Sequence, residues 1–189
     1  MICFDTMKKG VRVIVPALVL AISLVMSCRP NYEQKMRNLI GKELSFSSEL
    51  VRLLPDSIDV SPFPSALENQ KASIVFYFRS DECQTCIIEK IPDWAEKINE
   101  EFPDLHVFFI MPVSSSTAME LVAITKLIPN GSIVLDNHRV FSKENGFIPD
   151  EQFLRTWLVD SSGRILLVGN PADNPDLVSL FRQEIDKLQ

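Results

Sequence analysis

Histidine and cysteine are scarce in this sequence, with two and four copies among 189 residues. The two histidines, His106 and His138, stand far apart. Neither a second C-x-x-C nor an H-x₃-H accompanies the pair Cys83 and Cys86. A structural zinc site normally needs four ligands, so the pattern disfavours a metal site, and it implies no cofactor. We expect His106 in a strand, His138 in a polar turn, and each to be structural or solvent-facing.

Basic residues are also in the minority. The chain carries 19 Lys and Arg against 25 Asp and Glu, and its formal net charge is −6. A protein that binds nucleic acid neutralises phosphates with a basic stripe or patch, and no such stripe is present. The balance therefore argues against a nucleic-acid partner, and the acidic surplus is most simply a solvated surface.

No apolar run reaches the length of a bilayer-spanning helix, about 20 residues. The longest run near the N-terminus extends from about Val13 to Met26, and three basic residues precede it. Small Ser27 and then Cys28 follow it. This is the organisation of a secretory signal peptide, although an uncleaved N-terminal anchor is the alternative.

The ending Leu-Val-Met-Ser-Cys at residues 24–28 resembles a bacterial lipobox. The resemblance implies cleavage after Ser27 and a diacylglycerol on the thiol of Cys28. We therefore expect residues 1–27 to be a lipoprotein signal peptide and residues 28–40 to be the lipidated cysteine and a tether. Each buried CH₂ contributes about 0.8 kcal/mol, so the acyl chains would hold the protein on a membrane. The expected location is the bacterial cell envelope, lipid-anchored and facing the periplasm.

These assignments leave two available thiols. Cys3 would leave with the signal peptide and Cys28 would carry lipid, so Cys83 and Cys86 remain. Paired cysteines in an oxidising compartment form disulfides. Both available thiols of this chain stand in one C-x-x-C.

Strand and helix patterns alternate along the rest of the chain. We expect a brief edge strand within residues 41–50 and a loop over 55–71. Continuous apolar runs predict buried strands at 72–78 and 105–113, and residues 130–137 predict a turn and a short strand. Helical periodicity indicates helices at 83–102 and after Asn174, and a capping-box pattern of Thr117 with Glu120 predicts a helix that extends to Ile128. A hairpin is predicted at 153–160 and 164–169, with Gly163 free to take positive φ. The order predicts an α/β fold with a central mixed sheet, helices on both faces, and a C-terminal β-hairpin plus helix.

Cys83 stands where the first long helix begins, just after a buried strand. The free N–H groups and the positive dipole end at a helix N-terminus stabilise a thiolate, which is the reactive form of cysteine. The spacing places Cys86 one helical turn further on, close enough to form a disulfide. Position and order therefore suit a redox-active pair.

This order of elements, the C-x-x-C and Pro92 inside the following helix resemble the thioredoxin-like superfamily. Membrane-tethered periplasmic reductases of the TlpA kind and the redoxin/peroxiredoxin group are the closer resemblance, and "FLRTWLVDSSGRILLVGNP" is similar to their hairpin. The resemblance covers residues 41–189, which we expect to form a thioredoxin-like domain. It implies a thiol–disulfide oxidoreductase with Cys83 as the attacking thiolate and Cys86 as the resolving one. The implied partners are a protein disulfide or dithiol substrate and a membrane electron donor or acceptor.

Two features depart from the family pattern. Asp81 and Glu82 precede Cys83 where an aromatic residue is usual, and carboxylates beside a thiolate oppose its ionisation. Leu154 occupies the place of the family's cis-proline before the first hairpin strand, and Pro149 lies too far from that strand to replace it. The second departure concerns substrate docking more than the fold.

Two other functions stay open. A peroxiredoxin-like thiol peroxidase would activate Cys83 with Ser80 and with Arg155 from the hairpin, although Phe76 stands where that family has a proline. A non-catalytic binding lipoprotein would use the C-x-x-C as a structural disulfide. A loop this short gives little stabilisation relative to long-range bridges, so a redox role is the favoured interpretation. The direction of the reaction is not encoded in the pattern.

Overall fold

The computed structural model describes residues 32–54, 57–59, 63, 67, 69–112 and 118–188. The predicted signal peptide, the lipidation site Cys28 and residues 29–31 of the predicted tether lie outside the described residues. Residues 32–40 of that tether are described, and Leu39 among them is buried in the core. Residues 35–189 form one compact unit, which contains all the described strands. Among the described helices, none has both the length and the apolar character that crossing a bilayer requires.

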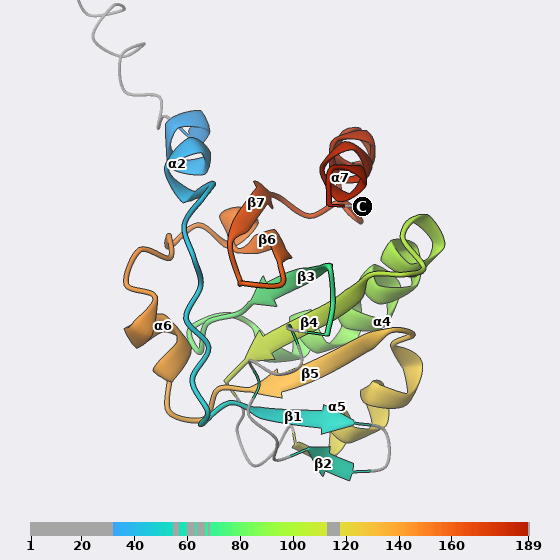
Figure 1. Cartoon of the computed structure of the whole chain (residues 1–189). Helices are drawn as coiled ribbons and strands as arrows, with labels where there is room; N and C mark the ends of the chain where they lie inside the picture. Colours follow the sequence, from blue (N-terminus) through green and yellow to red (C-terminus); the bar gives the residue numbers. More distant parts are fainter. Residues whose placement is uncertain are drawn as a thin grey trace, which may run out of the picture. The chain divides into compact units, whose positions relative to one another are not determined.

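The described residues build one seven-stranded mixed sheet in the order β2-β1-β5-β4-β3-β6-β7 (Figure 1). The strands are β1 (Val51–Leu54), β2 (Ser57–Asp59), β3 (Ala72–Tyr77), β4 (His106–Met111), β5 (Gly131–Leu135), β6 (Thr156–Asp160) and β7 (Ile165–Val168). Parallel pairing joins β3 to β4 and β4 to β5. β6 pairs antiparallel with β3, and β7 with β6. The predicted parallel core with a C-terminal antiparallel hairpin is confirmed.

Helices cover both faces of this sheet. They are α2 (Tyr32–Leu39), α4 (Gln84–Glu101), α5 (Ala118–Ile124), α6 (Val140–Glu144) and α7 (Asp176–Asp186), with 3₁₀ turns η1 (Thr125–Leu127) and η2 (Gln152–Leu154). Ile74 and Phe76 of β3 belong to the cluster that α4, α5 and α7 complete. The alternate residues Val75 and Tyr77 belong to a second cluster, together with Phe141 of α6. Side chains alternate along a strand, so a continuous apolar run is needed where both faces are covered. The predicted α/β class is confirmed.

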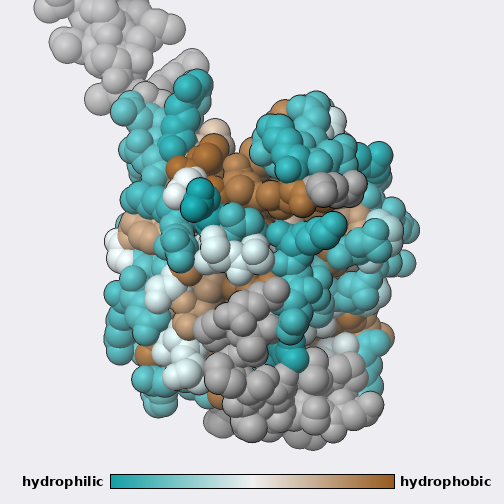
Figure 2. All heavy atoms as spheres, viewed as in Figure 1, coloured by the Kyte–Doolittle hydropathy of each residue, from teal (hydrophilic) through white to brown (hydrophobic). Residues whose placement is uncertain are grey.

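Helix α7 closes the first cluster beside the hairpin. Phe181 is fully buried there, whereas Leu177 and Val178 are only partly buried against the same cluster. Leu166 and Leu167 of β7 are also partly buried. Apolar surface accordingly gathers over β7 and beside α7 (Figure 2). The N-terminal end of α7 is therefore a place where the core reaches the surface.

The edge strand predicted within residues 41–50 is wrong. These residues form a single bridge, from Glu43 to Arg164 beside β7. Gly41 donates its N–H to Ile165 O, 2.7 Å away, and has φ +84°. A positive φ is incompatible with an extended strand, so the contact with β7 begins only at Gly41, and its backbone hydrogen bonds come from residues 41–44. Beyond β5 the sheet continues with β1, which is antiparallel to β5, and the edge strand on that side is β2, within the predicted loop.

Gly163, in the turn between β6 and β7, tests the predicted need for positive φ. Its φ is +85°, and an added Cβ would lie 2.9 Å from Leu44 O. Gly41 has a similar φ with nothing within 4 Å of an added Cβ, and Gly146 has neither constraint. A left-handed non-glycine residue costs about 1–2 kcal/mol. We expect the free energy of unfolding, measured by urea denaturation, to fall most for Gly163→Ala, by about that amount for Gly41→Ala, and little for Gly146→Ala. Equal stability of Gly163→Ala and Gly146→Ala would contradict this account.

Candidate active site

Cys83 is the N-cap residue of α4. Its backbone is extended, with φ −67° and ψ 94°, and its sulfur accepts a hydrogen bond from the Cys86 N–H at 3.3 Å. The sulfur thus occupies the position that a Ser, Thr or Asp oxygen normally takes at a helix start. Cys83 and Cys86 are joined in a disulfide with their Cα atoms 5.3 Å apart. Both residues are exposed. The predicted location at the helix start is confirmed.

The two residues between the cysteines hold this turn in different ways. The Gln84 Nε2 donates to Arg79 O at 2.8 Å and closes the loop that follows β3. The Thr85 Oγ1 lies 3.6 Å from the Cys83 sulfur. A disulfide sulfur carries no proton, so the Thr85 hydroxyl is the donor in this contact. The Cys83 sulfur therefore receives two donors, one from the backbone and one from a side chain.

The disulfide lies at the edge of a cavity of about 540 Å³. Residues from α4, from η2 and the start of β6, from the end of β7, and from the start of α7 line it. Phe76, Phe78 and Trp94 form an apolar part of the lining, with ring centroids 5.5–6.2 Å apart. The Trp94 Nε1 donates to Asp173 Oδ1 at 2.9 Å. Phe153, 54% exposed, is also part of the lining. An apolar group of a partner molecule can therefore lie next to the sulfurs.

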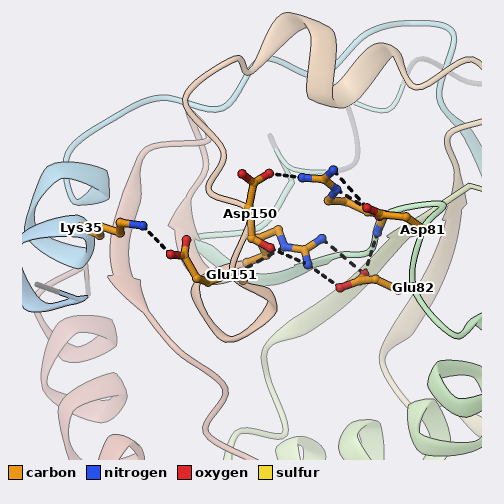
Figure 3. A network of polar contacts seen from close by, with 7 residues as sticks. Lys35, Asp81, Glu82, Asp150 and Glu151 are labelled. Carbon is orange, nitrogen blue, oxygen red and sulfur yellow. Dashed lines mark hydrogen bonds and ion pairs between the residues drawn. The ribbon is translucent and has the colours of Figure 1, made fainter. Parts of the chain in front are cut away.

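Both carboxylates that precede Cys83 are paired with arginines (Figure 3). The Arg155 guanidinium, 2% exposed, donates through Nη1 to Glu82 Oε2 at 3.3 Å and through Nη2 to Glu82 Oε1. The Arg79 Nε and Nη2 each donate to the carboxylate of Asp81 at 3.2 Å. The pKa of Asp81 lies below its ordinary value, chiefly because the carboxylate accepts its own backbone N–H, and the Arg79 pair adds to this. Arg79 also pairs with Asp150. The Glu82 carboxylate is therefore fully paired by a cation and the Asp81 carboxylate only partly, and their expected opposition to a thiolate is offset to that extent.

Several solved structures match this fold at low sequence identity. The reduced 2-Cys peroxiredoxin of Plasmodium vivax matches with a TM-score of 0.51 at 17% identity, covering 77% of this chain and 98% of that chain. A yeast mitochondrial 1-Cys peroxiredoxin gives 0.52 at 13% identity, with 78% of each chain covered. A putative thiol-disulfide oxidoreductase from Bacteroides vulgatus gives 0.50 at 16% identity, with 75% and 90% covered.

The fold is thioredoxin-like. Identities this low show the fold alone, and the predicted thioredoxin-like architecture is confirmed at that level. Neither the protein-family models nor the curated protein sequences give a match to this chain.

Leu154 and Arg155 lie in a turn rather than in a hairpin strand. Leu154 is fully buried at the end of η2, and Arg155 follows it, one residue before β6. The Leu154 N–H donates to Glu151 O at 3.1 Å, so this backbone is folded back on itself. The described residues contain no cis peptide bond. The backbone just before the first hairpin strand is thus hydrogen-bonded within its own turn.

The arginine of the peroxidase interpretation does not reach the sulfur in this state. Within the described residues, the hydrogen bonds of the Cys83 sulfur come from Cys86 and Thr85, and neither Ser80 nor Arg155 contributes one. Arg155 is engaged by Glu82 and by the carbonyl oxygens of residues 150 and 151. Sequence reasoning identified Glu82 and Arg155 separately. It missed their pairing, because that depends on how β6 is aligned with β3.

The two histidines lie apart from the cysteines and from each other. His106 is on β4 with its Nε2 2.9 Å from Ser132 Oγ, and His138 is exposed in the turn after β5. No group of three His, Cys, Asp or Glu in the described part of the chain is arranged to hold a metal ion. Burial lowers the pKa of His106 to about 4, and the Arg52 charge adds to the effect. His106 is therefore neutral at physiological pH.

The low pKa of His106 predicts a specific acid sensitivity. The unfolded chain takes up a proton at this position near pH 6.5, whereas the folded protein does so only near pH 4. Stability therefore falls as pH decreases through this window, by up to about 3 kcal/mol. His106→Gln, in which an amide nitrogen replaces Nε2, should lose this component. We expect urea denaturation between neutral pH and pH 4 to show a shallower decline for the variant than for the wild type. Parallel declines in the two proteins would show that His106 titrates normally.

Proposed function

We propose that the protein is a thiol–disulfide oxidoreductase in which Cys83 is the attacking cysteine and Cys86 the resolving one. The observation that carries the proposal is the exposed Cys83–Cys86 disulfide at the N-terminus of α4, beside a cavity. A bridge that served stability alone would gain little from so short a loop. Exposure of both residues favours a role in which the sulfurs meet another molecule.

The reaction proceeds in two exchanges. In the reduced protein, the Cys83 thiolate attacks one sulfur of a substrate disulfide, that bond breaks, and the other substrate sulfur leaves as a thiolate that takes up a proton. The Cys86 thiolate then attacks the Cys83 sulfur of the mixed disulfide, which releases the second substrate thiol. The substrate gains two electrons and two protons, and Cys83–Cys86 is oxidised by the same amount. Running backwards, the same steps oxidise a dithiol.

The assignment of roles follows from the helix. An N-cap sulfur faces the free N–H groups of the first turn, and these stabilise negative charge. The hydrogen bond from the Cys86 N–H already points at the Cys83 sulfur in the oxidised state. Cys86 lies within the helix and is placed to displace a substrate from Cys83.

The cellular setting is part of the same proposal. The lipobox resemblance supports removal of residues 1–27, lipidation of Cys28 and a place in the bacterial envelope facing the periplasm. Residues 28–34, which precede the compact unit, would then tether the domain to the membrane. The partners would be a protein disulfide or dithiol, together with a membrane electron donor or acceptor that regenerates the pair.

A thiol peroxidase is the second candidate, because peroxiredoxins are among the solved structures with this fold. In that reaction the Cys83 thiolate would attack a peroxide oxygen, forming a sulfenic acid and releasing an alcohol or water. Cys86 would then condense with the sulfenic acid to give the same disulfide and water. The engagement of Arg155 by Glu82 favours exchange over this alternative.

Trapping of a mixed disulfide distinguishes the roles of the two cysteines. We would use the full chain in detergent with Cys3→Ser and Cys28→Ser, and an oxidised peptide disulfide as the probe. Cys86→Ser should accumulate a Cys83–peptide adduct, seen as an added peptide mass, because the second exchange is blocked. Cys83→Ser should accumulate at least about tenfold less adduct, because the residual thiol at Cys86 lacks the N-cap position. Equal trapping by the two variants would contradict the assigned roles.

Hydrogen peroxide provides the matched comparison for the peroxidase alternative. The reduced wild-type pair should be oxidised by the peptide disulfide at a higher second-order rate than by peroxide. The reverse order of rates, with a sulfenic acid detected in Cys86→Ser, would replace the exchange proposal with the peroxidase.

A further inference from the structure

The Glu82–Arg155 ion pair is almost withdrawn from water. The Arg155 side chain is 2% exposed and the Glu82 side chain 16% exposed. The guanidinium also donates to the carbonyl oxygens of Asp150, at 3.4 Å, and Glu151, at 3.5 Å. The Glu82 Oε2 accepts a further bond from the Arg79 N–H at 2.8 Å. Each partner is therefore held by backbone groups from its own loop, and the pair joins the start of α4 to the turn before β6.

Stability is a weak reason for such a pair. Withdrawing two charges from water costs about as much as their attraction returns, and apolar replacements are often equally stable. Removing one partner, however, leaves the other buried and uncompensated. The pair does, however, fix the local charge balance at one place in the fold.

That place is the reactive turn. Glu82 is bonded covalently to Cys83, and Glu82, Cys83 and Arg155 all line the same cavity. A lone carboxylate there would oppose a negative sulfur, and a lone guanidinium would favour one. Water screens these effects poorly for a group as buried as Arg155. The nearby Asp81–Arg79 pair is on the exposed side of the turn, where such effects are weak.

We propose that Glu82 and Arg155 are positioning residues that set the charge balance at Cys83, so that each opposes the other's effect on the sulfur. This inference rests on the proposed role of Cys83 and deepens it. The consequence is a sign rule. Loss of the Glu82 charge leaves the cation and makes the Cys83 sulfur ionise more readily, whereas loss of the Arg155 charge does the opposite. Loss of both charges returns the sulfur close to its wild-type behaviour.

A charge-swap cycle tests the sign rule directly. The background is the full chain in detergent with Cys3→Ser, Cys28→Ser and Cys86→Ser, so that Cys83 is the single thiol. Alkylation by iodoacetamide is followed against pH by mass spectrometry, and the midpoint gives the pH at which half of the sulfur is ionised. The variants are Glu82→Gln, Arg155→Gln, their combination, and Arg155→Lys. Lys35→Met is the matched control, because it removes another ion pair to the loop before β6, that of Lys35 with Glu151.

The expected midpoint for Glu82→Gln is lower than in the background protein, and that for Arg155→Gln is higher. Each shift should amount to about threefold or more in the ionisation constant. The double variant and Arg155→Lys should lie between the two single variants, and Lys35→Met should match the background. If the ion pair served only to hold the fold together, the midpoints of both single variants would shift in the same direction. Shifts of the same sign, or no shift in either variant, would overturn the inference.

Two further measurements keep the result interpretable. Thermal unfolding of each variant reports whether the chain is folded, and if Arg155→Gln is unfolded, the comparison of Glu82→Gln with Arg155→Lys and the double variant decides the sign. Equilibration of the corresponding dithiol variants with glutathione provides the second readout. Because a stabilised thiolate stabilises the reduced pair, Glu82→Gln should be reduced more readily and Arg155→Gln less readily. Ionisation is measured on the reduced thiol and needs no exchange, so a protein that fails to exchange would refute the proposed function while the sign rule is still tested.

Discussion

The antiparallel pairing of β3 with β6 is the contact on which the candidate site depends. Phe76 lies opposite Thr156, and the Tyr77 N–H donates to Arg155 O at 2.9 Å. β3 is an interior strand that leads into the reactive turn, so this register places Arg155 beside the turn that carries Glu82. On its other side β3 pairs parallel with β4. Helix α4 follows β3 along the chain, so it begins at the end of the sheet where the antiparallel β6 starts. A shift of one residue would send every side chain of β6 to the opposite face, and the ion pair would be lost.

The chemistry of the site is a balance between a helix terminus and local charges. The N-terminus of α4 and the Cys86 N–H favour a negative Cys83 sulfur. Asp81 and Glu82 would oppose it, but each is paired with an arginine, and Arg79 is shared between Asp81 and Asp150. Of the two arginines, Arg155 is buried and Arg79 is partly exposed, so we expect the Glu82–Arg155 pair to have the larger influence. The sulfurs nevertheless remain accessible to a partner, because both cysteines are exposed and both line the cavity.

Local patterns predicted the parts of the structure that depend on neighbouring residues. The apolar run at 72–78 predicted β3, the periodicity after Cys83 predicted α4, and the SSG turn predicted positive φ at Gly163. Gly41 and the turn η2 were missed, because isolated residues in a left-handed or 3₁₀ conformation leave no periodic signal. The Glu82–Arg155 pair was missed for a different reason. Its partners are far apart in sequence, and only the sheet register brings them together. The anchor at Cys28 and the roles of the two cysteines remain predictions.

The reduction potential of the Cys83–Cys86 pair tests the central claim most directly. The full chain with Cys3→Ser and Cys28→Ser would be equilibrated in detergent with graded glutathione or dithiothreitol buffers, and the free thiols counted by alkylation and mass spectrometry. An exchange catalyst should show a reversible two-electron couple between about −270 and −120 mV. A potential below about −300 mV is that of an inert structural bridge, and it would contradict the assignment of this disulfide as a redox-active pair.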